Sequence, residues 1–277
     1  MNRDATARDG TAHVAPRETL CKSALNTTGI PGYDYCMNPY TGCTHACLYC
    51  YASFMCRFTD HSEPWGEFLD VKTNFPEVLA KQLGGRRKHP EGRVLIGTVT
   101  DAYQPAEARF RLTAASLELL AEYQLLDVNI LTKSDLVRRD AGILRRLPKC
   151  EVGFTITTMD RSVSDVLEPG ATPPENRLAA AAELLGSGVS VWVFIAPLLP
   201  GLTDTEASLA ALYRSLRGTG IRDIRIDRLN PYPGVVRRLK DVYRRCFPKA
   251  AADLEACLRD RESYRRDVAD RLRRIGA

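Results

Sequence analysis

The chain has 277 residues, of which 44% are hydrophobic and 26% charged, and its formal net charge is +5. This composition is that of a globular protein of one large domain or two small ones, and the lack of any run of about 18 apolar residues predicts no transmembrane helix and no membrane partner. Residues 1–18 lack the apolar core of a secretory signal, and nine cysteines without an export signal favour a cytoplasmic protein whose thiols stay reduced or bind metal.

The predicted elements alternate along the chain. Residues 1–20 are polar and lack periodicity, so we expect a disordered or loosely attached tail. Buried strands are predicted just before a cysteine-rich loop and at residues 94–100, 128–132, 152–158, 189–197 and 223–229. Helices are predicted at residues 112–123, 135–147, 174–186 and 203–216, the last with a capping box formed by Thr203 and Glu206.

This alternation amounts to about six strand–helix units, which predicts a parallel sheet. About six units are too few to close a barrel of eight strands. The pattern alone allows either a doubly wound sheet or a partial (β/α)6 barrel that is open along one side.

The last part of the chain, residues 236–277, is predicted to be a basic helical extension, with thirteen Lys and Arg residues against seven Asp and Glu. Its basic runs at residues 237–240 and 271–274 could meet the phosphates of a nucleic acid. A solvated face of one or two surface helices explains the same charge, so both interpretations stay open.

Three cysteines, Cys43, Cys47 and Cys50, are spaced C-x3-C-x2-C in one short loop. A 4Fe-4S cluster normally takes four thiolates, so three would leave one iron open, as in catalytic metal sites. The spacing, with Tyr49 before the third cysteine, resembles the signature of the radical S-adenosylmethionine (SAM) enzymes. Zinc is the alternative, with His45 or a distant cysteine as fourth ligand, although no second cysteine pair follows.

This resemblance implies a partial (β/α)6 TIM-like barrel, which we expect over residues 21–235. It also implies a 4Fe-4S cluster whose open iron binds the amino and carboxylate groups of SAM. Reductive cleavage of SAM would then release a 5′-deoxyadenosyl radical. The electron would come from a donor such as flavodoxin or ferredoxin.

Polar side chains at the carboxyl ends of the strands make up the expected SAM site, because functional groups gather there in parallel α/β folds. Asp101 with Thr100 suits the SAM ammonium, and Lys133 suits its carboxylate. The residues expected at the ribose are Thr155 or Thr157, and those expected at the adenine are Ile195, Ala196 and Tyr49.

Several further motifs indicate a closer resemblance, to one branch within the superfamily. They are the cysteine loop with its flanks at residues 38–52, Gly97-Thr98-x-Thr100-Asp101 with residues 103–107, Leu131-Thr132-Lys133-Ser134, Glu168-Pro169 with Arg177, and residues 196–201. In this order they resemble the spore photoproduct lyase-like branch of the superfamily over residues 22–233. The branch implies SAM contacts at Thr100, Asp101, Lys133 and Thr155. It makes Arg177 a candidate for the SAM carboxylate or for a structural pair with Glu168.

One position departs from that branch. In the lyase proper, a cysteine beside the Thr-Asp element donates a hydrogen atom to the product radical, and Thr98 takes that position here. A threonine O–H bond is too strong to donate a hydrogen atom to that radical, so we expect a reaction other than the lyase's cleavage of a thymine-dimer lesion. Cys36 and Cys56 flank the cysteine loop and are candidates for packed thiols or for a redox-active or hydrogen-donating catalytic thiol.

The sequence therefore predicts a radical SAM enzyme that abstracts hydrogen from an unidentified substrate, with nucleic acid as a candidate. One alternative is a zinc- or iron–sulfur-binding protein that binds nucleic acid and has no catalytic activity. Another is a radical SAM enzyme that modifies a peptide or a small molecule. Charged residues at strand ends, such as Asp101 and Lys133, favour an enzyme, because a mere binding module would not need them.

Overall fold

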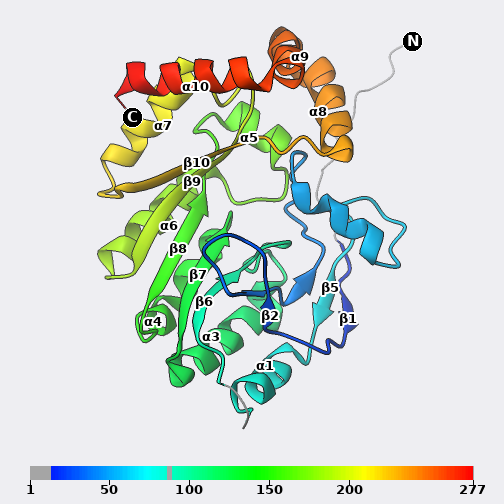
Figure 1. Cartoon of the computed structure of the whole chain (residues 1–277), viewed down its shortest axis with the longest axis vertical. Coiled ribbons are helices and arrows are strands. Elements are labelled where there is room, and N and C mark those ends of the chain that lie inside the picture. The colour runs from blue at the N-terminus through cyan, green and yellow to red at the C-terminus, as the bar shows by residue number, and fades with distance from the viewer. Residues whose placement is uncertain (1–13, 86–88, 277) are drawn as a thin grey trace, which may run out of the picture.

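The computed structural model describes residues 14–85 and 89–276. Within these residues, six parallel strands form the main sheet in the order β10-β9-β8-β7-β6-β3, and β2 pairs antiparallel with β3 at one edge (Figure 1). The strands are β2 (Asn26–Thr27), β3 (Tyr35–Met37), β6 (Gly92–Ile96), β7 (Leu126–Thr132), β8 (Cys150–Thr155), β9 (Ser190–Leu198) and β10 (Asp223–Arg228). The predicted parallel sheet of six strand–helix units is confirmed.

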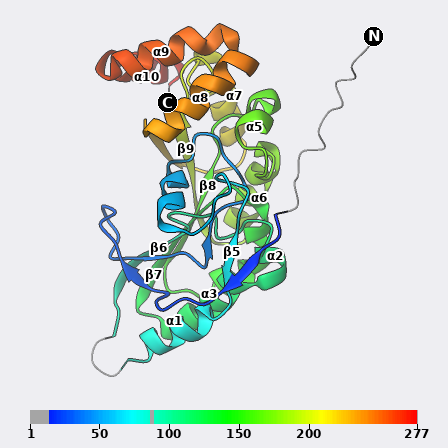
Figure 2. The same cartoon turned by 90° about the vertical axis from the view of Figure 1, so that its right-hand side faces the viewer.

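Helices connect successive strands and cover one face of the sheet (Figure 2). They are α1 (Phe75–Leu83), α2 (Glu107–Phe110), α3 (Leu112–Tyr123), α4 (Ala141–Leu144), α5 (Arg161–Leu167), α6 (Pro174–Gly186) and α7 (Glu206–Arg217). Alternate strand residues such as Val128, Ile130 and Phe154 are fully buried in the main core. Burial of this apolar face, at about 25 cal/mol per Å2, holds the helices on the sheet.

Three element boundaries differ from the sequence prediction. β6 ends at Ile96 because Gly97 turns the chain with a φ of +90°, so residues 97–100 are not strand. The expected helix at 135–147 is a 3-10 helix, η2 (Asp135–Asp140), followed by the short α4. The cap of α7 is Thr205, which accepts from the Ser208 N–H (3.1 Å), whereas the Thr203 hydroxyl accepts from the Leu199 N–H (2.8 Å).

A second, smaller sheet sits beside the main one. Its order is β1-β5-β4, with β1 (Arg17–Thr19), β5 (Asp70–Lys72) and β4 (Tyr40–Thr41). Arg17 forms ion pairs with Asp60 (2.8 Å) and Asp70 (2.6 Å). The predicted loose tail is therefore wrong from Arg17 onward, because strand pairing and these ion pairs fix that segment; residues 1–13 lie outside the described residues.

The C-terminal extension is helical, as predicted, and lies across one end of the sheet (Figure 1). It consists of α8 (Pro233–Cys246), the 3-10 helix η3 (Pro248–Ala250), α9 (Ala251–Arg259) and α10 (Arg261–Ile275). Val235, Leu239 and Tyr243 of α8 are buried in a second core that also contains Cys47 and Tyr49. The extension therefore packs directly against the cysteine loop. None of the helices in the described ranges combines the length and apolar character needed to cross a membrane.

Candidate active site

The cysteine loop lies at the carboxyl ends of the strands, between β4 and the 3-10 helix η1 (Tyr51–Phe58). Cys43, Cys47 and Cys50 all line one cavity of about 100 Å3. Two tight turns shape the loop: the Ala46 N–H donates to the Cys43 carbonyl (3.2 Å), and the Cys50 N–H donates to the Cys47 carbonyl (3.1 Å). The sequence spacing thus places three thiols on one cavity.

The environment of the thiols fits metal coordination. Burial raises the pKa of Cys47 to about 12 and also raises the pKa values of Cys43 and Cys50. Thiolates are therefore unfavourable here unless a bound cation compensates their charge, and metal coordination deprotonates a thiol outright.

The cysteines are not arranged around a single ion. Among residues 14–85 and 89–276, no group of three or more His, Cys, Asp and Glu side chains is placed to hold one metal ion. A tetrahedral zinc site needs its ligands around one point, whereas an iron–sulfur cluster binds each thiolate at a different iron.

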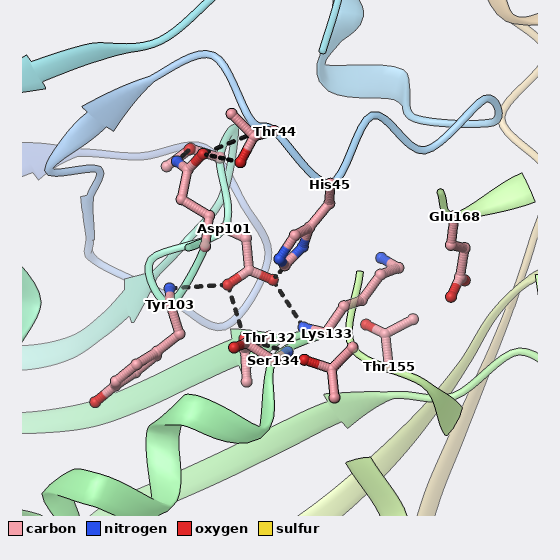
Figure 3. Close-up of polar contacts among 12 residues, drawn as sticks. Thr44, His45, Asp101, Tyr103, Thr132, Lys133, Ser134, Thr155 and Glu168 are labelled. Carbon is pink, nitrogen blue, oxygen red and sulfur yellow. Dashed lines mark hydrogen bonds and ion pairs between the residues drawn. The ribbon is translucent and has the colours of Figure 1, made fainter. Parts of the chain in front are cut away.

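Asp101 is buried just beyond the end of β6 and accepts hydrogen bonds on both carboxylate oxygens (Figure 3). Its donors are the Tyr103 N–H (2.9 Å), the Thr132 hydroxyl (2.7 Å) and the Lys133 N–H (2.7 Å). His45 Nδ1 lies 3.3 Å from the same carboxylate. Burial alone would raise the pKa of Asp101, but His45 and the hydrogen bonds lower it to about 2. Asp101 thus ties the cysteine loop, through His45, to the end of β7.

A second set of hydrogen bonds ties the start of the cysteine loop to the segment after β6. The Thr100 hydroxyl donates to the Gly42 carbonyl (2.6 Å), and Gln104 Nε2 donates to the Thr100 hydroxyl (3.0 Å). Gln104 Oε1 accepts from the Thr44 N–H (3.0 Å). Gly42 has a φ of +86°, and a Cβ there would lie 2.5 Å from the Phe68 carbonyl oxygen, so this position needs glycine.

Glu168 is the second buried carboxylate of the site. The Tyr49 hydroxyl donates to one of its oxygens, as does the Thr157 hydroxyl (3.2 Å), and Arg177 Nη2 donates to the other. Arg177 Nη1 also donates to the Thr155 carbonyl (3.0 Å). Burial raises the pKa of Glu168, but Arg177 and the other donors lower it overall. Of the two roles proposed for Arg177, the structure shows the pair with Glu168.

Lys133 lies between these two carboxylates, and its side chain extends from the Asp101 side toward Glu168 (Figure 3). Its ammonium is 5.5 Å from the centroid of the Tyr49 ring. Burial lowers the pKa of Lys133, but the negative charges of Cys47 and Glu168 outweigh burial, and the net shift is upward. Within the described part of the chain, the ammonium has no hydrogen-bond partner, so this charge on the cavity wall is available to a ligand.

Most of the predicted contact residues share the cavity. Those that line it are Cys43, Cys47, Cys50, Thr100, Asp101, Lys133 and Thr155. Among the described residues, those that do not line it are Tyr49, Thr157, Arg177, Ile195 and Ala196, together with the candidate thiols Cys36 and Cys56. Ile195 is fully buried in the main core, on the helix side of the sheet. The roles assigned to all of these residues in SAM binding remain predictions.

The structure also brings to the cavity several residues that were not predicted to bind either cofactor. Trp65 lines it, and its Nε1 is buried with no hydrogen-bond partner among the described residues. Tyr51 also lines it and donates to the Thr98 carbonyl. Thr98, which aligns with the hydrogen-donating cysteine of the lyase, lines the cavity, and its hydroxyl accepts a hydrogen bond from Asn38 Nδ2 (2.8 Å). Tyr51 could have been found from its place beside Cys50, but no local signal marks Trp65.

Comparison with known families shows which superfamily the chain belongs to. Residues 37–212 match the family model described as the radical SAM superfamily. The chain belongs to the radical SAM superfamily. A protein of Methanocaldococcus jannaschii is 37% identical over 67% of this chain and 68% of that relative. A protein of Mycobacterium tuberculosis is 31% identical over 82% of this chain and 73% of that relative.

Solved radical SAM structures share the fold. A spore photoproduct lyase variant with bound AdoMet and dinucleoside spore photoproduct superimposes with a TM-score of 0.67, over 94% of this chain and 78% of that one, at 20% identity. Streptococcus suis SuiB bound to the precursor peptide SuiA gives a TM-score of 0.51, over 83% of this chain and 46% of that one, at 15% identity. These likenesses confirm the predicted partial TIM-like barrel.

The radical SAM superfamily implies a 4Fe-4S cluster and SAM, and the side chains that line the cavity include chemical groups suited to both. It presents the buried thiols of Cys43 and Cys47, the half-buried thiol of Cys50, the Lys133 ammonium and the Trp65 N–H, which has no partner among the described residues. Gly97 also lines it, and a Cβ there would lie 3.0 Å from the Leu131 carbonyl oxygen. Thiolates are the ligands of an iron–sulfur cluster, and an ammonium is a suitable partner for the carboxylate of SAM.

The basic extension presents less free charge than its sequence indicated. Within the described residues, its ion pairs are Lys240–Glu255, Arg245–Asp241, Arg265–Glu262, Arg271–Asp204, Arg273–Asp270 and Arg274–Glu206. Arg238 points inward and donates to the cysteine loop. These contacts compensate part of the positive charge of the extension, and positive charge alone gives little support to phosphate binding.

Proposed function

We propose that this protein binds a 4Fe-4S cluster through Cys43, Cys47 and Cys50, binds SAM beside it, and abstracts hydrogen from a substrate. When bound, the cluster would supply the electron that cleaves SAM into methionine and a 5′-deoxyadenosyl radical. A flavodoxin- or ferredoxin-type protein is the proposed electron donor. One observation carries the proposal: three thiols and the Lys133 ammonium share one cavity at the carboxyl ends of the strands.

The chain's own residues bind and orient the reactants. The Lys133 ammonium is the proposed partner of the SAM carboxylate, because it faces the cavity and stays protonated. Trp65 supplies a further N–H donor on the same wall. Asp101 and Glu168 keep the cysteine loop in register with β7 and β8, which keeps the thiols and Lys133 on one cavity.

The cluster assignment is tested by removing one ligand. We expect Cys47→Ala to lose the cluster after anaerobic reconstitution, because the loop offers three thiolates and the cube needs all of them. Cys150→Ala and Cys257→Ala, which change thiols away from the cavity, should keep wild-type iron and sulfide content. Full iron and sulfide in Cys47→Ala would overturn the assignment. The wild-type protein with SAM and a chemical reductant should release 5′-deoxyadenosine.

For the substrate class we propose a nucleic acid strand, supported by an aromatic surface at the mouth of the cavity. Phe54 contacts Tyr51, Phe58 and Tyr232, with ring centroids 6.2 to 6.4 Å apart. Tyr51, Phe58 and Tyr232 are 41%, 73% and 44% exposed, which is enough to present ring faces. Tyr51 also lines the cavity, and Arg57 is exposed beside Phe58. Aromatic rings next to basic side chains are typical of surfaces that stack unpaired bases.

The substrate proposal is tested by binding of single-stranded DNA and RNA at several salt concentrations. We expect Phe58→Ala and Tyr232→Ala each to weaken binding by about 1–3 kcal/mol, the range for one stacked base. Leu125→Ala, which removes another exposed apolar side chain, is the matched control and should bind like wild type. If wild type shows no salt-dependent binding at low ionic strength, the nucleic acid proposal fails. A peptide or small molecule would then be the substrate to test.

A further inference from the structure

Arg238 of α8 reaches the cysteine loop from the C-terminal extension. Its Nε donates to the Leu48 carbonyl (3.0 Å), and its Nη2 donates to the Cys50 carbonyl (3.2 Å) and to the Ser53 hydroxyl (2.9 Å). We propose that Arg238 is a positioning residue that holds the third cluster thiolate in place and raises the reduction potential of the cluster. This inference rests on the proposed function, because it requires a cluster in the loop.

The contacts fall on the segment between the second and third cysteines and on the first turn of η1. Cys50 precedes η1 without any side-chain cap of its own. The Leu48 N–H donates to the Leu167 carbonyl (2.9 Å), so the same residue is held from α5 on its other side. A planar guanidinium can bond several acceptors at fixed angles, which a lysine ammonium cannot reproduce. Arg238 therefore fixes the backbone that carries the Cys50 thiol.

Packing of α8 determines where this guanidinium points. Leu239 and Val242 are buried in the second core, and that core also contains Tyr49 and Leu167. Arg238 lies at the edge of this buried stripe and is half-buried, and desolvation lowers its pKa from the usual value. Because the charge is partly removed from water, it is less screened than a surface arginine. Arg237, the next residue along the chain, is exposed.

A fixed cation beside the cluster changes the energy of its redox step. Reduction adds one negative charge to the cluster, and a nearby positive charge stabilises that state. Hydrogen bonding and local charge are among the factors that set the potentials of iron–sulfur clusters. Loss of Arg238 should therefore make the cluster harder to reduce, in addition to loosening the loop.

The test compares Arg238→Gln, Arg238→Lys and Arg237→Gln with wild type in the full-length, anaerobically reconstituted protein. Arg237→Gln removes the same charge from the same helix without touching the loop, so it is the matched control. At one fixed ambient potential, we expect the ratio of reduced to oxidised cluster in Arg238→Gln to fall by roughly tenfold, the scale of one partly screened unit charge. Arg237→Gln should retain the wild-type ratio.

Arg238→Lys separates the charge from the geometry. It should keep a ratio near that of wild type, yet give a broader electron paramagnetic resonance signal, because one ammonium cannot hold the Leu48 and Cys50 carbonyls together. If Arg238→Gln does not fold by circular dichroism, Arg238→Lys must show that broadening for the proposal to stand. A wild-type ratio and an unchanged signal in both Arg238 variants would overturn this proposal alone. A wild-type protein that binds no iron or sulfide would overturn the proposed function as well.

Discussion

Two buried carboxylates hold the cysteine loop, and they do so by different means. Asp101 is surrounded by four donors, which are two backbone N–H groups, the Thr132 hydroxyl and the His45 ring. Glu168 instead pairs with Arg177, which is 1% exposed and always charged. The negative charge of Glu168 is therefore compensated by a permanently charged guanidinium, whereas that of Asp101 is stabilised by His45 together with the hydrogen bonds.

This difference changes how a charge at a strand end is interpreted. Asp101 was predicted to bind the SAM ammonium, yet its two oxygens already face four donors. A carboxylate so fully bonded can position the loop whether or not it also touches SAM. Lys133 lines the same cavity, and its charged ammonium, unlike the Asp101 carboxylate, has no hydrogen-bond partner within the described residues. We therefore propose the two carboxylates as supports of the loop, and the ammonium between them as the contact to SAM.

The largest effect is expected from breaking the Glu168–Arg177 pair. Glu168→Gln leaves a buried guanidinium without its counter-charge, and loss of one member of a buried pair costs about 3–5 kcal/mol. The free energy of unfolding of the cofactor-free protein, measured in urea, should fall by this amount.

A double variant shows whether the charge or the packing is responsible. Glu168→Gln combined with Arg177→Met removes both charges and should recover a large part of the lost stability, because no unpaired buried charge remains. If the double variant is less stable than Glu168→Gln alone, compensation of charge is not what Glu168 contributes.

Asp101→Asn should have an intermediate effect. The amide keeps one acceptor oxygen but places an NH2 group where the second carboxylate oxygen accepted a hydrogen bond. The hydrogen bonds that can no longer form should cost about 1–3 kcal/mol. The loss should be visible in the cofactor-free protein by the same urea measurement. Weaker SAM binding with unchanged stability of the cofactor-free protein would instead show that Asp101 acts by direct contact with the SAM ammonium.

Local patterns predicted the elements well and the long-range contacts poorly. The helix at 112–123 and the helix at 174–186 have the predicted bounds, because apolar spacing and flanking residues determine both. The cysteine triplet and Lys133 were placed on one cavity from their positions at strand ends. By contrast, Tyr49 meets Glu168 119 residues later, and Arg238 meets Leu48 across 190 residues. Nothing near any of these residues marks its partner, since each contact exists only after the sheet and α8 have packed.

Among these variants, a change at Lys133 should have the smallest effect on stability and the largest effect on SAM binding. Lys133→Met keeps the aliphatic stem and breaks no hydrogen bond within the described residues, so the free energy of unfolding should change by less than about 1 kcal/mol. SAM would lose a charge-assisted bond worth about 1.5–3 kcal/mol, which is a tenfold to hundredfold loss of affinity. Equilibrium binding of SAM to the cluster-loaded protein measures this loss. Thr155→Val, a neutral change on the same cavity wall, is the control and should lose less. Equal losses in the two variants would show that Lys133 does not pair with the SAM carboxylate.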